Sequence, residues 1–579
     1  MPFLGVDVGG TFTDAVLVDD AAVHVVKVAT AERQEEAVLA AVAALGADGI
    51  ERFTHGTTIA TNALLERRGA RTAFVTTAGF EHLLHLRRQN RAHLYRLCAD
   101  HPPPLVPLER CLGVTERCGP GGVLEPLDLS SLPDPGDVDA VAVCLLFSFR
   151  HPEHEREVAA ELRRRRPDVH VVASHEVAPE FREYERSSTT AADAYLTPLL
   201  GGYLRSLATL CCEAGVPEPL VMRSSGGVVT LEEAAAHAAF ALLSGPAAGA
   251  IGAAHVARLA GVENALSLDM GGTSTDVCAI VDGKPLRGSE RPVAGLPVRL
   301  PALDVHTVGA GGGSLVWRDA GGALRVGPES AGAWPGPACY GRGGTDATVT
   351  DANLLLGRLP GRLADGLELD TDAAWRALDG VDPADVVAVV DAELLRALRL
   401  VSVERGIDPR GLSLVAFGGA GPLHACSVAE ELELERVLVP AAAGVLSALG
   451  LLVAGERRDH VEARVVPLAR AGDLPDEGEA DLRYEGQSFE LTVPLGRDVA
   501  EAFHRAHEDR YGYADRDRAL ELVAVRTADV TPGPDVSLTG RSLTVRGPEV
   551  VELDGATCWV PAGWAGATDA HGTLVLERT

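Results

Sequence analysis

The stretch that decides the fold is D-V-G-G-T-F-T-D at Asp7–Asp14, which returns as D-M-G-G-T-S-T-D at Asp269–Asp276. Six of the eight positions agree, at an offset of 262 residues. A short apolar run precedes and follows each copy, which predicts a strand, a glycine turn and a second strand. Two such hairpins so far apart in one chain predict two similar α/β lobes rather than a solenoid.

The residues of the hairpin suit the binding of phosphate. Gly9 and Gly10 lack a Cβ, so their backbone can approach a ligand closely and, with Thr11, present N–H groups to an anion. The hydroxyls of Thr11 and Thr13 can donate to phosphate oxygens. Asp7 would repel bare phosphate, but it attracts a hydrated Mg²⁺ placed between them. The second copy offers the same set in Asp269, Gly271, Gly272, Thr273 and Thr275, so two facing hairpins would hold a triphosphate from both sides.

Other nucleotide motifs can be tested directly. A Walker A loop requires G-K-[ST], and neither of the two lysines, Lys27 and Lys284, lies in one, which excludes a P-loop enzyme. No G-x-G-x-x-G stands between an expected strand and helix, which disfavours a dinucleotide fold. An apolar run at 412–417 does lead into Gly418-Gly419-Ala420-Gly421. A glycine loop between strand and helix can lie against a flat adenosine ring.

Composition narrows the function further. The chain has 579 residues and a net charge of −30, and an acidic surface of this size disfavours nucleic acid and anionic membranes as partners. The ten cysteines form no C-x-x-C pair, and no signal peptide is visible at the N-terminus, so we expect a cytoplasmic protein. The uncharged stretch 437–455 imitates a membrane span, but its proline and glycines predict a buried strand, a loop and a helix.

With these motifs in view, the chain resembles the hydantoinase A/5-oxoprolinase family, within the ATPase fold of actin, sugar and acetate kinases and heat-shock chaperones. The matching segments cover nearly the whole chain and begin at His55 (HGTTIATNALLE), Pro179 (PEFREYERSSTT), Arg223 (RSSGG), Leu243 (LSGPAAG), Asp269 (DMGGTSTD), His306 (HTVGAGGGS), Gly327 (GPESAGAWPGPACYGRGG), Thr348 (TVTDANLLLGRL) and Gly418 (GGAGPLHA). The chain departs from the family at Ala347, where a proline is usual.

The resemblance implies an α/β fold of two actin-like (RNase H-like) lobes with a duplicated phosphate-binding hairpin, plus a β-rich C-terminal domain. We expect domains at 1–180, 181–455 and 456–579. The resemblance also implies ATP and Mg²⁺ as cofactors, a hydantoinase B-like subunit as partner and hence a hetero-oligomer. The implied activity is ATP-dependent hydrolysis of a cyclic amide such as a hydantoin or 5-oxoproline, through phosphoryl activation of the substrate.

Two alternatives to this activity remain open at this point. The same ATP machinery serves the acetone and acetophenone carboxylase subunits of the family. A non-catalytic module driven by ATP, like actin or the chaperones, is an alternative of another class. The dense polar motifs outside the ATP site, such as the one at His55, have no evident purpose in a pure ATPase switch.

Candidate site residues follow from the hairpins and from the family motifs. The catalytic candidates are Asp7, Asp269, Asp276 and His55, and Asp7 and Asp269 would hold Mg²⁺ through water. The candidate adenosine loop is Gly418, Gly419 and Gly421. Candidate substrate residues are Thr57, Thr58, Asp304, His306 and His424, although Thr57 and Thr58 could simply cap a helix. Three histidine pairs have metal-like spacing: His82 and His85, His151 and His154, and His504 and His507, the last on an expected surface helix. None of the three pairs is expected to hold a metal.

Overall fold

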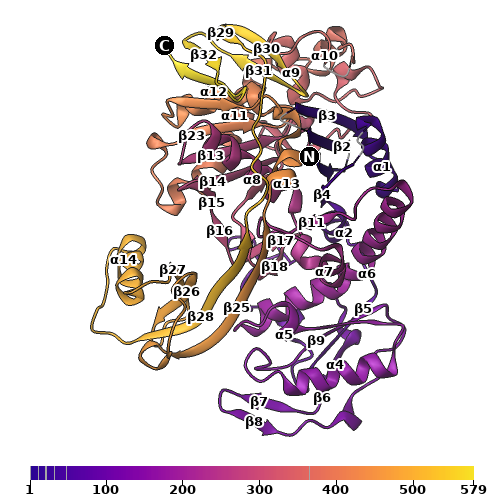
Figure 1. The fold of residues 1–579 in the computed structure, drawn as a ribbon, viewed down its shortest axis with the longest axis vertical. Coiled ribbons are helices and arrows are strands. Elements are labelled where there is room, and N and C mark those ends of the chain that lie inside the picture. The colour runs from indigo at the N-terminus through magenta and orange to yellow at the C-terminus, as the bar shows by residue number, and fades with distance from the viewer. Residues whose placement is uncertain (1, 11, 20–21, 32, 47–48, 364–365) are drawn as a thin grey trace.

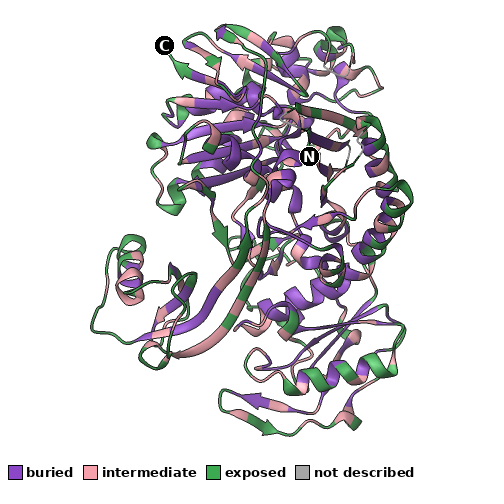
Figure 2. Ribbon diagram, viewed as in Figure 1, coloured by how far each residue is buried: buried purple, intermediate pink, exposed green. Residues whose placement is uncertain are grey.

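The computed structural model describes residues 2–10, 12–19, 22–31, 33–46, 49–363 and 366–579. Two large mixed sheets dominate it, and a smaller four-stranded sheet lies at one end of the long axis (Figure 1). Buried residues follow the strands of the two large sheets and the helices between them (Figure 2). This arrangement confirms the expected α/β class.

The first predicted hairpin lies near one edge of a ten-stranded sheet. Strands β1 (Phe3–Val8) and β2 (Phe12–Asp19) pair antiparallel, and β3 (Ala22–Ala29) continues the meander. On the other side β1 runs parallel to β4 (Arg52–Thr57), which runs parallel to β11 (Leu220–Met222). Helix α1 (Gln34–Leu45) connects β3 to β4, and α2 (Ile59–Leu65) follows β4.

The second hairpin repeats this topology in a nine-stranded sheet. Strands β13 (Ala265–Met270) and β14 (Thr275–Val281) pair antiparallel, and β15 (Lys284–Pro285) follows at the edge. On the other side β13 runs parallel to β23 (Ser413–Phe417), and β23 runs parallel to β24 (Arg436–Val439). The register is the same in both copies, because Asp7 faces Asp14 and Asp269 faces Asp276. Two lobes of equivalent topology confirm the duplication.

Two helices pack against each other between the sheets, α8 (Ser244–Leu259) and α13 (Leu446–Val453). Their closeness depends on glycine. A Cβ added at Gly450 would lie 1.9 Å from the carbonyl oxygen of Ala248, and one at Gly252 would lie 2.7 Å from that of Leu446. At such distances the backbones would have to separate, so small residues set the spacing of the helices and, with it, the spacing of the two lobes.

A separate four-stranded sheet, in the order β10–β9–β5–β6, follows the first hairpin in sequence. Its strands are β5 (Thr72–Thr77), β6 (Cys111–Val114), β9 (Ala140–Cys144) and β10 (His170–Ala173). Helix α4 (Glu153–Arg165) packs against it, and the long helix α6 (Glu183–Ala214) joins it to the first lobe. The hairpin β7–β8 (Arg117–Gly119, Gly122–Glu125) projects from its end (Figure 1).

Residues 456–579 are rich in strands, and most of these strands join the two large sheets. Strands β25 (Glu456–Pro467) and β28 (Leu520–Thr531) form a long arm, with β26 (Glu479–Tyr484), β27 (Leu491–Pro494) and α14 (Val499–Tyr511) at its end, and they extend the first sheet through β12 (Val228–Val229). Strands β29 (Thr544–Arg546), β32 (Trp564–Thr568) and β33 (Leu574–Arg578) extend the second sheet. The hairpin β30–β31 (Glu549–Leu553, Ala556–Val560) stands beside them.

The arm is held midway along β28 by a buried ionic junction around Glu180. Its carboxylate accepts from Arg299 at 2.6 Å and from Arg526 of β28 at 2.7 Å. Arg526 also pairs with Asp481 of β26 at 2.8 Å. Removing one member of such a buried group leaves an uncompensated charge, which is strongly destabilising. The junction therefore fixes the arm to the segment that precedes α6.

The stretch 437–455, which imitates a membrane span, forms β24, a short turn at Ala443–Val445 and helix α13. The predicted strand, loop and helix are confirmed. Among the described residues, no helix combines the length and the apolar character that crossing a membrane would require.

Candidate active site

The turns of the two hairpins have matching geometry. The N–H of Gly9 donates to the carbonyl of Phe12 at 2.9 Å, and that of Gly271 donates to Ser274 at 3.0 Å. These bonds close the turns and use the first glycine N–H of each. Gly10, Gly272 and Thr273 are exposed at the tips, so their N–H groups remain the ones suited to phosphate. Thr11 lies outside the described residues.

Helix α8 lies against the carboxylates of both hairpins. A Cβ added at Gly245 would lie 3.5 Å from Asp7 Oδ2, and one at Gly249 would lie 3.2 Å from Asp269 Oδ2. The two glycines are one helical turn apart, which is a rise of about 6 Å. The structure thus places Asp7 and Asp269 against the same face of one helix.

Burial and mutual repulsion shift the pKa of these acids upward. Burial, with the nearby Asp14 carboxylate, raises the pKa of Asp7 to about 7. Burial, with Asp276 and then Asp7, raises the pKa of Asp269 to about 8. Burial also raises the pKa of Asp276 to about 6, although the hydroxyl of Thr307 opposes the change. A cluster of buried acids of this kind favours a bound cation.

The hydrogen bonding of the two acids also fits a cation. Asp7 Oδ1 is buried and accepts no hydrogen bond from any described residue. Asp269 Oδ2 accepts a long hydrogen bond, at 3.4 Å, from the hydroxyl of Ser447 in the first turn of α13. A hydrated Mg²⁺ bound by one or two carboxylates matches this oxygen-only donor set. The residues present therefore fit the magnesium that the sequence predicts.

The glycine loop after β23 lies beside Asp269. Gly418 has φ of +79°, and a Cβ on it would lie 2.5 Å from Asp269 Oδ1. Gly421 opens helix α12 (Gly421–Glu431), and its Cβ would lie 3.2 Å from the carbonyl of Leu268. Gly419 is exposed, with no protein atom closer than 3.9 Å to an added Cβ. Gly418 and Gly421 are thus needed by the fold, while Gly419 offers an open surface to a ligand.

Comparison with known proteins identifies the family of the chain. The model of a family described as Hydantoinase/oxoprolinase matches residues 186–460, and that of the Hydantoinase/oxoprolinase N-terminal region matches residues 3–165. The caprolactamase subunit alpha of Pseudomonas jessenii is 32% identical, over 97% of this chain and 90% of its own length. The chain belongs to the hydantoinase/oxoprolinase family.

Further relatives differ in how much of their own length the chain matches. The 5-oxoprolinase 1 of Arabidopsis thaliana is 32% identical over 83% of this chain, but the match spans only 45% of the plant protein. The acetophenone carboxylase gamma subunit of Aromatoleum aromaticum is 33% identical over 77% of this chain and 67% of its own length. Among solved structures, the ATP-dependent caprolactamase of Pseudomonas jessenii superposes with a TM-score of 0.86, at 29% identity over 99% of both chains.

His55, a catalytic candidate from the sequence, lies inside the first lobe rather than beside the paired acids. His55 is fully buried on β4, opposite Val6 rather than Asp7. Its Nδ1 donates to the carbonyl of Val6 at 3.1 Å, and its Nε2 accepts from the hydroxyl of Tyr203 at 2.9 Å. Burial lowers the pKa of His55 to about 4. A neutral ring with both nitrogens occupied supports the strand, and the geometry does not favour the predicted catalytic role.

The threonines of the motifs are also held by the protein itself. The hydroxyls of Thr13 and Thr275 are fully buried; the first contacts the Thr30 hydroxyl at 3.1 Å, and the second donates to the carbonyl of Ala310 at 2.5 Å. These bonds brace the hairpins, so the geometry does not favour the phosphate contacts predicted for them. Thr57 exchanges hydrogen bonds with Ser244 at the start of α8, and Thr58 donates to the carbonyl of Val8.

The remaining substrate candidates lie in the second lobe. Asp304 pairs with Arg405 at 2.9 Å, and His306 lies half-buried on β20 (His306–Val308), which pairs with β14. His424 is fully buried between Asp391, at 2.6 Å from Nδ1, and Asn353. His306 thus lies one position from Thr307, the partner of Asp276, whereas His424 belongs to the core.

Four functional candidates escaped the sequence reasoning. Gly245, Gly249 and Ser447 contact the paired acids, and Lys27 on β3 forms an ion pair with Asp14 opposite it. The family motif at 243–249 was the available signal for the two glycines. For Lys27 the signal was its rarity, since the chain has only two lysines.

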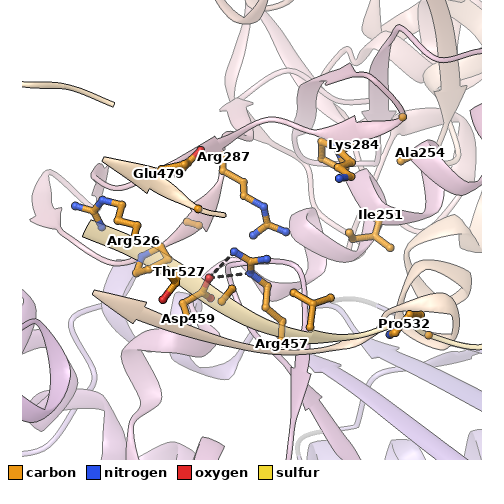
Figure 3. Close-up of a pocket in the computed structure, with 18 of the residues that line it drawn as sticks. Ile251, Ala254, Lys284, Arg287, Arg457, Asp459, Glu479, Arg526, Thr527 and Pro532 are labelled. Carbon is orange, nitrogen blue, oxygen red and sulfur yellow. Dashed lines mark hydrogen bonds and ion pairs between the residues drawn. The ribbon is translucent and has the colours of Figure 1, made fainter. Parts of the chain in front are cut away.

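A groove of about 1100 Å³ lies away from the paired acids, between the later turns of α8, the edge of the second sheet and the arm. Figure 3 shows the guanidinium groups of Arg287 and Arg457 approaching each other inside it, with Asp459 bonded to Arg457. None of the site residues predicted from the sequence lines this groove.

Proposed function

We propose that this chain is the ATP-binding subunit of an enzyme that hydrolyses a cyclic amide at the expense of ATP. The observation that carries the proposal is the pair of partly buried acids, Asp7 and Asp269, one on each duplicated hairpin and both against α8. Several relatives support the chemistry, since their names and titles include caprolactamase and 5-oxoprolinase.

The residues of the chain have separable tasks in this proposal. The turns at Gly10 and at Gly272 and Thr273 bind the phosphates from two sides through backbone N–H groups. Gly419 gives the adenosine a flat surface. Asp7 and Asp269 orient the hydrated Mg²⁺, which neutralises phosphate charge when bound. Because an amide nitrogen is a poor leaving group, phosphorylation of the carbonyl oxygen is the step that makes the ring carbon open to water.

Burial supports the positioning of the acids. Asp7 and Asp269 lie on strands that are paired on both sides, and the glycines of α8 place no side chain against their oxygens. Carboxylates fixed in this way cost little reorganisation when the transition state forms. Asp276 faces Asp269 from the neighbouring strand β14 and accepts a hydrogen bond from the Thr307 hydroxyl. We propose that its carboxylate adds negative charge that helps the site to hold the cation.

We further propose a hydantoinase B-like partner, and hence a hetero-oligomer. The relatives include a protein named as subunit alpha and one named as gamma subunit. The match to Arabidopsis 5-oxoprolinase 1 covers less than half of that protein, so a second component is a natural source for the rest of the reaction. The cytoplasmic location expected from the sequence belongs to this proposal too; all ten cysteines are free, as in a reducing compartment.

The test is ATP hydrolysis by the chain together with its B-like partner, in Mg²⁺ buffer, against caprolactam, 5-oxoproline and a hydantoin. One of these should stimulate phosphate release, with the ring-opened product formed in proportion and no effect of bicarbonate. If phosphate release instead required both a ketone and bicarbonate, the chain would belong to the carboxylase branch. The acetophenone carboxylase relative is the reason to test this alternative. ATP turnover that ignores every substrate would indicate a conformational ATPase.

A further inference from the structure

Three metal-ligating side chains converge at the end of the four-stranded sheet, far in sequence from either hairpin. They are Glu116, Cys118 and His154, and their ligand atoms all lie within 4.8 Å of one another. Glu116 and Cys118 stand at alternate positions of one extended segment, so their side chains share a face. His154 comes from the first turn of α4. No other cluster of this kind occurs among the described residues.

The same nitrogen of His154 faces both other groups. His154 Nδ1 lies 2.9 Å from Glu116 Oε2 and 3.6 Å from Cys118 Sγ. In a catalytic relay the two imidazole nitrogens would serve different partners, one the nucleophile and the other the carboxylate. Here a single nitrogen, one oxygen and one sulfur point at a common space, which is the arrangement of a chelate.

The spacing fits a tetrahedral ion. Bond lengths of about 2.3 Å to sulfur and 2.0–2.1 Å to nitrogen place the two ligand atoms about 3.5 Å apart around tetrahedral zinc. The sulfur–nitrogen distance of 3.6 Å already has this value, and the nitrogen–oxygen distance of 2.9 Å needs to open by only a few tenths of an ångström. The carboxylate is also oriented from behind, because its second oxygen accepts from the Thr77 hydroxyl. Such support is usual for metal-binding carboxylates.

The burial of the cluster adds a second argument. Cys118 and Glu116 are each 3% exposed, yet the hairpin β7–β8 that follows Glu116 pairs in a sheet only with itself. Its second strand is largely exposed, with Val123 and Leu124 at 57% and 72% (Figure 2). The hairpin therefore has little apolar packing to hold it against α4, and a shared ion would supply that link.

We propose that Glu116, Cys118 and His154 form a zinc site, with water in the fourth position, that pins the β7–β8 hairpin to helix α4. Zinc is favoured over magnesium and calcium because the site mixes sulfur, nitrogen and oxygen ligands, and hard cations prefer oxygen alone. The site is distinct from the proposed magnesium at Asp7 and Asp269, and it does not depend on which substrate the enzyme takes.

The test uses the full chain, stripped with a chelator and then titrated with Zn²⁺ against a chromophoric competitor. We expect one tight site per chain, and at least about tenfold weaker binding in Cys118→Ser and in His154→Gln. Cys98→Ser and His151→Gln are matched controls that should bind as the wild type does. Replacement by Co²⁺ should give a thiolate charge-transfer band that Cys118→Ser lacks.

Folding is monitored separately, so that loss of structure is not mistaken for loss of a ligand. Zn²⁺ should raise the melting temperature of the wild type and of both controls, but not that of Cys118→Ser. Failure of the wild type to compete for Zn²⁺, or a cobalt band that persists in Cys118→Ser, would overturn the proposal.

Discussion

The carboxylate of Asp7 lies close enough to that of Asp269 to help raise the pKa of Asp269 to about 8, although 262 residues separate them in sequence. Each acid is the second-last residue of a first hairpin strand, and a Cβ added at a glycine of α8 would contact its carboxylate. The duplication thus places two acids against one helix. A bound cation, as proposed above, would relieve the repulsion between their charged forms.

Neutralising either acid should abolish the proposed activity. Asp7→Asn and Asp269→Asn should each lower Mg²⁺-dependent ATP turnover by at least about 100-fold, or roughly 2.7 kcal/mol of transition-state stabilisation. Steady-state phosphate release with the partner subunit and substrate measures the effect. Asp473→Asn, in an exposed loop of the arm, is the control. Turnover within a few-fold of the wild type in both site variants would remove these acids from the mechanism.

The same acids should make the ligand-free protein less stable as the pH rises. Their ordinary pKa is 3.8, and in the folded chain it is about 7 for Asp7 and about 8 for Asp269. An acid with a raised pKa stabilises the fold fully below its unfolded value and loses that contribution as the pH passes its folded value. The melting temperature should therefore fall between about pH 4 and pH 8, apart from other groups.

A double variant, Asp7→Asn with Asp269→Asn, isolates this contribution. Its melting temperature should depend less steeply on pH across the same window, because neither amide titrates. Adding Mg²⁺ and ATP should stabilise the wild type more than the double variant. Parallel pH profiles for the two proteins would show that the acids keep their ordinary pKa in the fold.

Two neighbouring glycines should respond differently to substitution. Gly418→Ala forces a Cβ onto a residue with φ of +79°, 2.5 Å from Asp269 Oδ1, so it should lower both stability and nucleotide affinity. Gly419→Val meets open space in the protein and should change the free energy of unfolding by less than about 0.5 kcal/mol. Calorimetric titration should nevertheless show weakened ATP binding by Gly419→Val; unchanged affinity would place the adenosine elsewhere.

The role of His55 can be separated from catalysis through its partner. Tyr203→Phe removes the donor to His55 Nε2 and should cost about 1–3 kcal/mol in the free energy of unfolding, since a buried acceptor is left unpaired. Turnover per folded molecule and its pH profile should not change. Tyr195→Phe, on the same helix α6, is the control for loss of a hydroxyl. A shifted pH profile in Tyr203→Phe alone would restore a catalytic role for His55.

Features that depend on a short contiguous stretch of sequence could be predicted. The repeated eight residues gave the two lobes, their strand–turn–strand form and the paired acids, because a glycine turn between apolar runs has few structural alternatives. The stretch 437–455 was predictable for a similar reason, since Pro440 and its glycines interrupt any long helix. The strand, glycine loop and helix around Gly418 were predictable in the same way, because an apolar run leads into the glycines and a proline follows them.

Features that depend on strand register and on packing between distant segments could not be predicted from the sequence. His55 faces Val6 rather than Asp7 because of the pairing of β4 with β1, and a shift of one residue would reverse its direction. Likewise, His154 is 36 residues from Cys118, with no motif to link them. His504 and His507, expected on the surface, are buried beside Tyr484. The domain boundaries at 180 and 455 stay predictions.

The division of the C-terminal strands between the two sheets has a mechanical consequence. Strands between residues 456 and 531 join one lobe's sheet and those between 544 and 578 join the other's, so the connecting segment 532–543 is a tether that joins the lobes a third time, after the connections through α8 and α13. At its start a Cβ on Gly533 would lie 2.1 Å from the carbonyl of Val453, so this end cannot slide past α13. If the lobes close around a nucleotide, the tether must bend or rotate with them. Because the arm is bonded to the tether at one end and to Glu180 along its length, its far end would then move as well.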